Sequence, residues 1–216
     1  MDKNRRHFIS LVGTALASAT AGAQVAKITD GGYAPVKQKQ RSERDTPLVP
    51  PGAKSLRAVD KHCTACQLCI ANCPNEVLYP SDAIGSLMQV RMDYSQGWCR
   101  PECNVCSQLC PTGAIEPITP EEKSSTKIGT AVVDLSTCIS AAYGQECGLC
   151  ARSCPAGAIS MLKVNPDNDN RTPVVNAEVC IGCGSCEYHC PVGRIGTNRN
   201  NTAAIHVEGV EVHREI

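Results

Sequence analysis

Apolar side chains occur along this chain in short runs, which turn-forming residues separate. β-Branched runs at 131–134 and 173–176 precede two dense groups of cysteines, and small apolar runs at 112–115 and 156–159 follow two Cys-Pro pairs. Runs of this kind, bounded by Gly, Pro and Asn, predict short strands. The repeating unit is therefore a strand, a loop that contains cysteines, a short helical turn and a second strand.

The N-terminal region has a different pattern. Two adjacent arginines, Arg5 and Arg6, are followed after one residue by Phe and Ile, and this resembles a twin-arginine export signal. A mild apolar run at 11–23 is short for a membrane span and ends in the small-x-small form of a signal-peptidase site. We therefore predict a twin-arginine signal peptide at 1–23. An uncleaved N-terminal anchor is the alternative.

Residues 24–56 are predicted to be a linker. The segment 35–45 is charged and lacks apolar periodicity, and Pro47, Pro50 and Pro51 stiffen the approach to the first cysteines. A solvated leader is the preferred interpretation of this segment, and a tether or docking arm is the alternative.

Composition limits how the rest of the chain can build a core. Among 216 residues there are one Trp and one Phe, and much of the 42% hydrophobic content is Cys and small residues. An ordinary core of large apolar side chains is hard to build from these, so we expect inorganic clusters to fill the interior. Formal net charge is zero, and removal of residues 1–23 takes away three basic residues and one acidic residue to leave −2. This balance gives no reason to expect nucleic-acid binding.

Sixteen cysteines fall into four quartets, with none left over. The first and fourth quartets have the spacing C-x2-C-x2-C-x3-C-P, which in bacterial proteins holds a cubane iron–sulfur cluster. The second quartet has x3 and the third has x8 between the first two cysteines, so the inserted segment 139–146 must bulge outward. The quartets, predicted to bind four [4Fe–4S] clusters, are Cys63, Cys66, Cys69 and Cys73; Cys99, Cys103, Cys106 and Cys110; Cys138, Cys147, Cys150 and Cys154; and Cys180, Cys183, Cys186 and Cys190.

Two other interpretations of the cysteines remain open. An even number of cysteines permits a disulfide framework, and C-x2-C pairs bind zinc. Both fit poorly, because a zinc site has no need of a third cysteine at the next x2 step. A disulfide scaffold, for its part, does not repeat one tight quartet with a proline after each.

The fold predicted for residues 57–216 is α+β, with tandem bacterial two-cluster ferredoxin-like modules. Short strands, short helices and long loops would surround the clusters. The fourth cysteine of each quartet usually ligates a neighbouring cluster, and a helical turn from the third to the fourth cysteine rises roughly 6 Å. Paired clusters would then lie on the order of 10 Å apart, which suits electron tunnelling. The twin-arginine route exports folded proteins, so it suits a protein whose cofactor is inserted before export.

No sequence pattern indicates a substrate site, so we expect an electron carrier and not an enzyme. His62 and His189 adjoin cysteines, and each either donates to sulfur or is an ordinary surface or packing histidine. Trp98 and Tyr188 are expected to shield cluster faces. The segment 165–170 has turn chemistry and is predicted to be a hairpin tip.

The chain resembles the NapG/MauM family of periplasmic ferredoxin-type proteins. The four quartets carry this resemblance together with the residues at 5–8, 49–53 and 110–115, which read RRHF, VPPGA and CPTGAI. The family implies a periplasmic protein that takes electrons from a membrane quinol dehydrogenase and passes them to a periplasmic reductase, such as nitrate reductase. Contact with the membrane would occur only through a partner or an uncleaved N-terminus.

Related four-cluster proteins also imply how the quartets pair, with the outer two together and the inner two together. The implied ligand sets are Cys63, Cys66, Cys69 and Cys190; Cys180, Cys183, Cys186 and Cys73; Cys99, Cys103, Cys106 and Cys154; and Cys138, Cys147, Cys150 and Cys110.

Two alternative functions stay open at this point. The same set of clusters also occurs in the electron-transfer subunit of a molybdopterin oxidoreductase, a formate dehydrogenase or a hydrogenase. A disulfide- or zinc-stabilised binding module is the alternative from another class, and it predicts a colourless protein.

Overall fold

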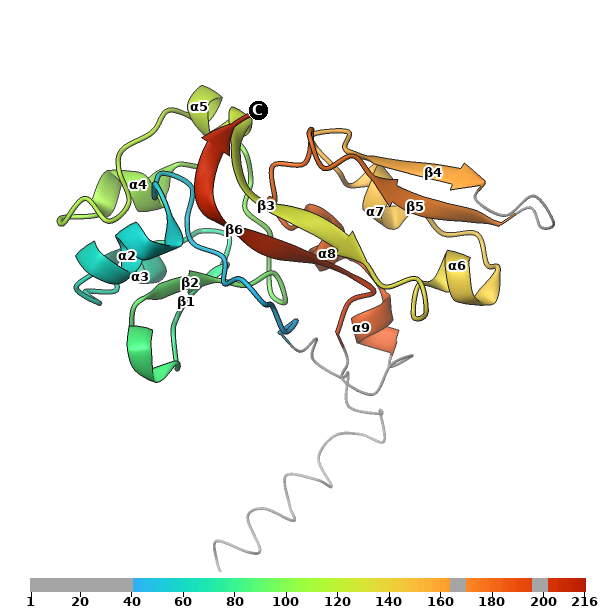
Figure 1. Cartoon of the computed structure of the whole chain (residues 1–216), viewed down its shortest axis with the longest axis horizontal. Coiled ribbons are helices and arrows are strands. Elements are labelled where there is room, and N and C mark those ends of the chain that lie inside the picture. The colour runs from blue at the N-terminus through green and yellow to red at the C-terminus, as the bar shows by residue number, and fades with distance from the viewer. Residues whose placement is uncertain (1–40, 164–169, 196–201) are drawn as a thin grey trace, which may run out of the picture. The chain divides into compact units, whose positions relative to one another are not determined.

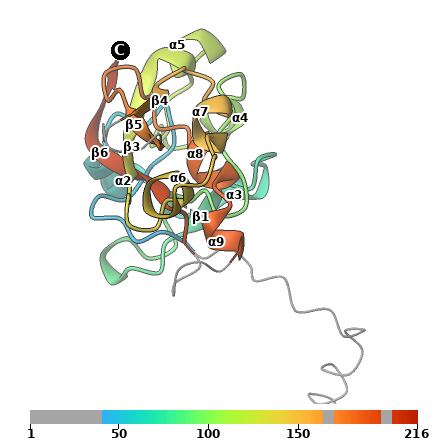
Figure 2. The same ribbon diagram turned by 90° about the vertical axis from the view of Figure 1, so that its right-hand side faces the viewer.

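Short helices and three separate two-stranded antiparallel sheets make up the computed structural model of this chain (Figures 1 and 2). The structure describes residues 41–163, 170–195 and 202–216, all within the unit Lys37–Ile216. The predicted signal peptide, residues 24–40 of the predicted linker and nearly all of the predicted 165–170 turn lie outside the described residues. Of the helices that the structure describes, none has the length and apolar character needed to cross a membrane.

Helices are short because the cysteine loops interrupt them every few residues. The described elements, in chain order, are α2 (Leu56–His62), α3 (Leu68–Ala71), β1 (Leu78–Pro80), the 3₁₀ turn η1 (Ile84–Ser86), β2 (Val90–Met92), α4 (Val105–Leu109), α5 (Pro120–Ser125), β3 (Thr126–Val133), α6 (Ile139–Tyr143), α7 (Leu149–Arg152), β4 (Ile159–Lys163), β5 (Arg171–Val175), α8 (Ser185–His189), α9 (Val192–Ile195) and β6 (Ile205–Glu215).

The third cysteine of every quartet lies in a short helix, as the sequence predicted. These helices are α3, α4, α7 and α8, and the fourth cysteine follows at or just beyond the end of each. α3 packs against α4, and α7 packs against α8. The first quartet therefore lies beside the second, and the third beside the fourth.

Two short hairpins explain this arrangement. β1 pairs with β2 between the first and second quartets, with Leu78 opposite Met92. β4 pairs with β5 between the third and fourth quartets, with Ile159 opposite Val175. An antiparallel hairpin reverses the chain within a few residues. Each hairpin thus returns the chain to the quartet that it has just left.

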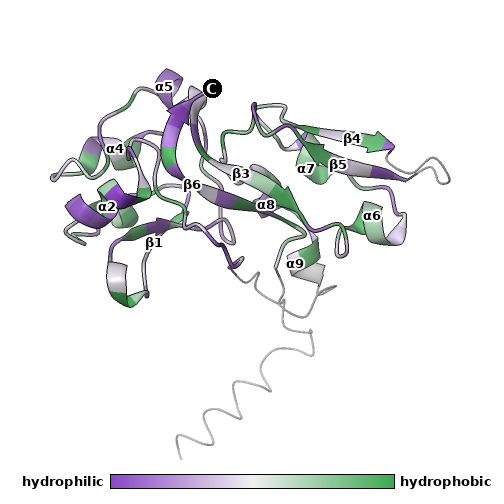
Figure 3. Cartoon of the chain, in the orientation of Figure 1, coloured by the Kyte–Doolittle hydropathy of each residue, from purple (hydrophilic) through white to green (hydrophobic). Residues whose placement is uncertain are grey.

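The longest sheet pairs β3 with β6, which lie side by side in both views (Figures 1 and 2). Val133 lies opposite Ile205 at one end and Thr126 opposite Glu215 at the other, with a bulge between Lys127 and Gly129. Burial is strongest at the start of β6, and the strand becomes polar toward its C-terminal end (Figure 3). This sheet brackets the third and fourth quartets, since β3 precedes them and β6 follows them.

The strand predicted at 112–115 is absent among the described residues, whereas the one predicted at 156–159 leads into β4. Ile115 is buried, and the next N–H, of Glu116, donates to the carbonyl oxygen of Gly52 at 2.9 Å. The chain opposite is the tight turn at 51–53, where Pro51 has no N–H to extend a ladder. One hydrogen bond therefore takes the place of a strand pair.

The predicted solvated linker is wrong for its described part. Leu48 and Val49 are 1% exposed, and Ala53 is also buried. The N–H of Met92 donates to the carbonyl oxygen of Leu48 at 3.0 Å, which attaches this segment to β2. Apolar residues placed between prolines have packed into the core instead of remaining in solvent. We call residues 42–55 the N-terminal strap.

Candidate metal centres

All sixteen cysteines lie in the described part of the chain, and all are free thiols. Two cavities of nearly equal size are each lined by four of them. The first, about 370 Å³, is lined by Cys63, Cys66, Cys69 and Cys110, here named site 1. The second, about 380 Å³, is lined by Cys138, Cys147, Cys150 and Cys190, here named site 3. Equal donor sets at both sites are what a repeated ligand requires.

The remaining eight cysteines form two further groups. A cavity of about 290 Å³ is lined by Cys73, Cys99, Cys103 and Cys106, here named site 2. The thiols of Cys154 and Cys180 lie close enough to Cys183 to raise its pKa, after burial as the larger cause, to about 12. Cys180 and Cys183 act in the same direction on the buried Cys186. Cys154, Cys180, Cys183 and Cys186 are here named site 4.

This grouping differs from the one that related four-cluster proteins implied. Cys110, not Cys190, stands beside the first three cysteines of the first quartet, and Cys73, not Cys154, beside those of the second. Likewise Cys190 stands beside the third quartet in place of Cys110, and Cys154 beside the fourth in place of Cys73. The hairpins β1–β2 and β4–β5 are the physical reason, because they fold neighbouring quartets together.

Positive φ angles in the cysteine loops let the backbone curl around each site. In the fourth quartet Gly182 and Gly184 have φ of 82° and 78°. A Cβ on Gly184 would lie 2.1 Å from the ring of Tyr94, and one on Gly182 would lie 2.5 Å from the backbone of Gly129. In the first quartet Ala65 and Gln67 occupy the matching places with φ of 57° and 61°, although they carry side chains. The curl is therefore common to both loops, and only one of them has glycine there.

Backbone N–H groups point at several sulfur atoms. The N–H of Ala131 lies 3.4 Å from Sγ of Cys180, and the N–H of Ala158 lies 3.3 Å from Sγ of Cys154. At Cys110 burial raises the pKa, but hydrogen bonds from the backbone of Ile115, Thr112 and Ala114 and from the Thr112 hydroxyl outweigh it and lower the pKa overall. Donors of this kind stabilise thiolate, the form that binds metal.

Most of the other perturbed thiols have the opposite shift. Burial, followed by the charges of neighbouring thiols, raises the pKa of Cys69 to about 11 and that of Cys106 to about 12. Burial is also the largest cause at Cys150, whose pKa is raised to about 11. Four thiolates this close and this buried require a positive ligand between them, and binding it displaces their protons.

The arrangement of the donors fits a polynuclear cluster. In the described ranges, no three Cys, His, Asp or Glu side chains converge on the position of one metal ion. Instead, four thiols line the wall of each cavity at sites 1, 2 and 3. A cubane cluster takes one thiolate at each of its four irons, so its ligands must stand around a cavity.

The sites follow one another in a single file. Cys69 of site 1 is close enough to Cys106 of site 2 to influence its pKa, and Cys150 of site 3 does the same to Cys186 of site 4. Between the halves, the N–H of Cys99 donates to the carbonyl oxygen of Cys183 at 2.9 Å. The order is therefore site 1, site 2, site 4, site 3.

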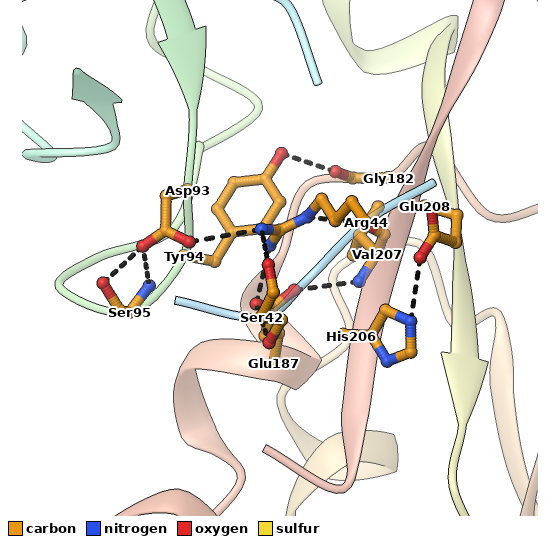
Figure 4. Close-up of polar contacts among 10 residues, drawn as sticks. All are labelled: Ser42, Arg44, Asp93, Tyr94, Ser95, Gly182, Glu187, His206, Val207 and Glu208. Carbon is orange, nitrogen blue, oxygen red and sulfur yellow. Dashed lines mark hydrogen bonds and ion pairs between the residues drawn. The ribbon is translucent and has the colours of Figure 1, made fainter. Parts of the chain in front are cut away.

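Tyr94 fills the joint between sites 2 and 4. Its side chain is fully buried, and its hydroxyl donates to the carbonyl oxygen of Gly182 at 2.7 Å (Figure 4). Burial, and next Cys99 and Cys183, raise the pKa of Tyr94, which keeps the phenol neutral. Tyr94 thus fixes the loop of the fourth quartet against the segment that follows β2.

A buried ionic network holds the N-terminal strap across the same joint (Figure 4). Arg44 pairs with Glu187 at 2.7 Å and with Asp93 at 3.2 Å, and it donates to the carbonyl oxygen of Val207 at 2.8 Å. Burial lowers the pKa of Arg44, but the two carboxylates outweigh it and raise the pKa overall. Glu187 also accepts from the N–H of Val207 at 2.8 Å. The network joins the strap, the segment after β2, α8 and β6.

The structure also places the histidines and aromatic residues that the sequence singled out. His62 is exposed. Nδ1 of His189 lies 2.8 Å from the carbonyl oxygen of Ser185, so this nitrogen carries a proton. The rings of Trp98 and Tyr188 both pack against His189. Sequence reasoning missed Arg44 and Tyr94, because no local pattern marks a residue whose partners lie far away along the chain.

Comparisons with known proteins agree with the chemistry of these sites. The 4Fe-4S dicluster domain family matches residues 145–194, and a 4Fe-4S binding domain family matches residues 61–79. The methylamine utilization ferredoxin-type protein MauM of Methylobacillus flagellatus is 30% identical over 67% of this chain and 64% of its own length. MauM of Methylophilus methylotrophus is 31% identical over 66% of each chain. The ferredoxin-type protein NapG of Haemophilus influenzae is 29% identical over 75% of this chain and 64% of its own length.

These matches define the class of protein. The chain carries 4Fe–4S domains and is similar to ferredoxin-type proteins. Within that class it belongs to the NapG/MauM family, as its sequence predicted. It spans 64–66% of the length of the MauM and NapG relatives described above.

Proposed function

We propose that this chain is an exported electron carrier with four [4Fe–4S] clusters in one file. One observation carries the proposal: sixteen free thiols form four sets of four, and each set lies close to the next from one end of the file to the other. A bound [4Fe–4S] cluster accepts and releases one electron. Tandem two-cluster modules follow from the same proposal, with sites 1 and 2 in one module and sites 3 and 4 in the other.

Each set of thiols would ligate one cluster. Three ligands come from one quartet, and the fourth is the Cys-Pro cysteine of the neighbouring quartet. The proposed sets are Cys63, Cys66, Cys69 and Cys110; Cys73, Cys99, Cys103 and Cys106; Cys154, Cys180, Cys183 and Cys186; and Cys138, Cys147, Cys150 and Cys190.

The positions of sites 1 and 3 indicate where electrons would enter and leave the row of four sites. Cys66 at site 1 is exposed, and α6 beside site 3 presents Tyr143 with 59% of its surface in solvent. The inserted segment 139–146 bulges outward there, as predicted, but as the helix α6. Cys66 is the exposed cysteine among the sixteen, and every site also contains at least one buried cysteine. Because sites 1 and 3 stand at the two ends of the file, electrons would enter and leave there and cross the middle through sites 2 and 4.

Export and partners complete the proposal. The arginine pair at Arg5 and Arg6 supports export of the folded, cluster-loaded protein to the periplasm by the twin-arginine route. Its partners would be a membrane quinol dehydrogenase as donor and a periplasmic reductase as acceptor. Exchange of both arginines for lysine should leave the protein in the cytoplasm with its clusters intact, and unchanged export would reject the route.

Iron and acid-labile sulfide per chain test the cofactor directly, on protein purified without oxygen. Four cubanes predict about sixteen of each. About eight would mean that one module is empty and would reject the count of four. Near-zero iron in a colourless protein that carries zinc or disulfides would reject the function. Stable co-purification with a large catalytic subunit would favour the subunit of a redox complex over a free carrier.

A further inference from the structure

Lys123 enters the protein interior from α5, next to site 2. Thr119 and Glu122 form a capping box at the start of this helix, with hydrogen bonds of 3.2 and 2.8 Å, and Pro120 occupies its first turn. The short helix is thereby fixed in place. Its Lys123 is only 5% exposed, whereas the helix is otherwise largely exposed.

The ammonium group of Lys123 contacts the loop that makes the second quartet irregular. It donates to the carbonyl oxygen of Arg100 at 2.5 Å and to that of Cys103. These two carbonyls bracket Pro101 and the extra residue of the C-x3-C spacing. Among the described residues no carboxylate pairs with Lys123, and its hydrogen bonds go to these two carbonyl oxygens.

Lys123 also stands at the junction of the two inner sites. It lines the cavity of site 2, and it lines a second small cavity between Cys99 and Cys183. Burial raises the pKa of Cys99, and the charge of Lys123 opposes that rise. A buried ammonium group without a carboxylate partner needs a counter-charge, and the thiolates that share its cavity at site 2 can supply it.

We propose that Lys123 is a positioning residue whose fixed positive charge raises the reduction potential of site 2. The inference rests on the proposed function. Reduction adds one electron to site 2, and no bond forms or breaks. Net charge and hydrogen bonding near the sulfurs are two of the factors that set cluster potentials. A unit charge a few ångströms away, at an effective dielectric constant of about 20, changes an equilibrium more than tenfold.

Redox titration of the full cluster-loaded protein, monitored by electron paramagnetic resonance, tests this. Electrons are supplied by dithionite through redox mediators. Lys123→Gln retains a hydrogen-bond donor but removes the charge, and Lys123→Met removes both. We expect both variants to lower the reduction equilibrium constant of one cluster at least tenfold, which corresponds to about 59 mV for one electron. We expect Lys123→Arg to stay close to the wild-type value. Cys103→Ser should alter the same redox step, which assigns it to site 2.

Lys127 offers a matched control four residues away. It is 1% exposed, and its ammonium group donates to the carbonyl oxygen of Ala177. Lys127→Met should leave the site 2 step in place. An equal shift in Lys127→Met would overturn the assignment to Lys123.

Iron content separates the possible failures. Wild-type protein with about sixteen irons and an unshifted step in both Lys123→Gln and Lys123→Met overturns the inference and keeps the proposed function. Iron lost in Lys123→Met but kept in Lys123→Gln, with no shift in the latter, would show a purely structural role. Wild-type protein without iron overturns both the inference and the proposed function.

Discussion

Replacement of Arg44 by methionine should strongly destabilise the cluster-loaded protein. The Arg44 side chain is 7% exposed, and the side chains of its partners Asp93 and Glu187 are 6% and 1% exposed. Methionine fills a similar volume but leaves two buried carboxylates without their cation. Removal of one partner from a buried ion pair costs about 3–5 kcal/mol. For a chain of this size, that lowers the unfolding midpoint by roughly 6–20 °C.

The visible absorbance of the clusters provides the assay. It is followed during heating without oxygen, at one fixed scan rate because cluster loss is irreversible. Lys54 supplies the matched control, since it pairs with Glu116 at the same 2.7 Å but is 74% exposed. Lys54→Met should cost at most about 1 kcal/mol, or roughly 4 °C.

A double variant checks the physical reason. In Arg44→Met with Glu187→Gln, one uncompensated charge is gone, so part of the lost stability should return. If Arg44→Met unfolds within 2 °C of Lys54→Met, burial does not decide the strength of these pairs. If the double variant is no more stable than the single one, the loss comes from packing and not from charge.

Three further predictions follow from backbone and burial. Ala65→Gly and Gln67→Gly should each raise the free energy of unfolding by about 1 kcal/mol, because glycine relieves the strain of positive φ at these positions, where the fourth quartet already has glycine. A lowered thermal unfolding midpoint in either variant would contradict this. Gly184→Ala should lower the free energy of unfolding by about 3 kcal/mol, because the new Cβ would clash with the Tyr94 ring. Gly113→Ala also has positive φ but open space around it, and it should cost about 1 kcal/mol. Equal losses in the two variants would refute the clash with Tyr94. Burial lowers the pKa of His213 to about 4, below its value of about 6.5 in the unfolded chain. Below about pH 6.5 the unfolded chain binds a proton that the folded chain does not. The free energy of unfolding should therefore fall by about 2 kcal/mol between neutral pH and pH 5. Midpoints at both pH values should show a smaller fall in His213→Gln, and an equal fall would exclude His213 as the cause.

Local features of the site were predictable because they depend on neighbouring residues. The short helix at the third cysteine and the outward segment 139–146 appear in the structure. The strands predicted at 131–134 and 173–176 appear as the ends of β3 and β5, each of which stops one residue earlier. Spacing alone also indicated the cofactor, since thiolates a few residues apart must share one ligand.

The predictions that proved wrong depend on contacts between segments that are far apart in the sequence. The solvated linker was inferred from charge and proline between 35 and 51, yet Leu48 and Val49 pack beneath β2. The strand at 112–115 had a suitable sequence but no partner strand, because a proline turn stands opposite it. A strand needs a second strand as well as its own residues, and one segment of sequence does not reveal its partner.

By itself, the sequence of this protein predicted the cysteine donors, their number, and the helical turn at the third cysteine of each quartet. These are short-range properties set by residue type and spacing. Only the tertiary structure decided which quartet places a fourth thiol at each site. It also decided which charged side chains lie near the sites. The hairpins β1–β2 and β4–β5 join neighbouring quartets, and Arg44 meets Glu187 across 143 residues. Contacts of that length arise from packing of the whole chain, and no local pattern encodes them.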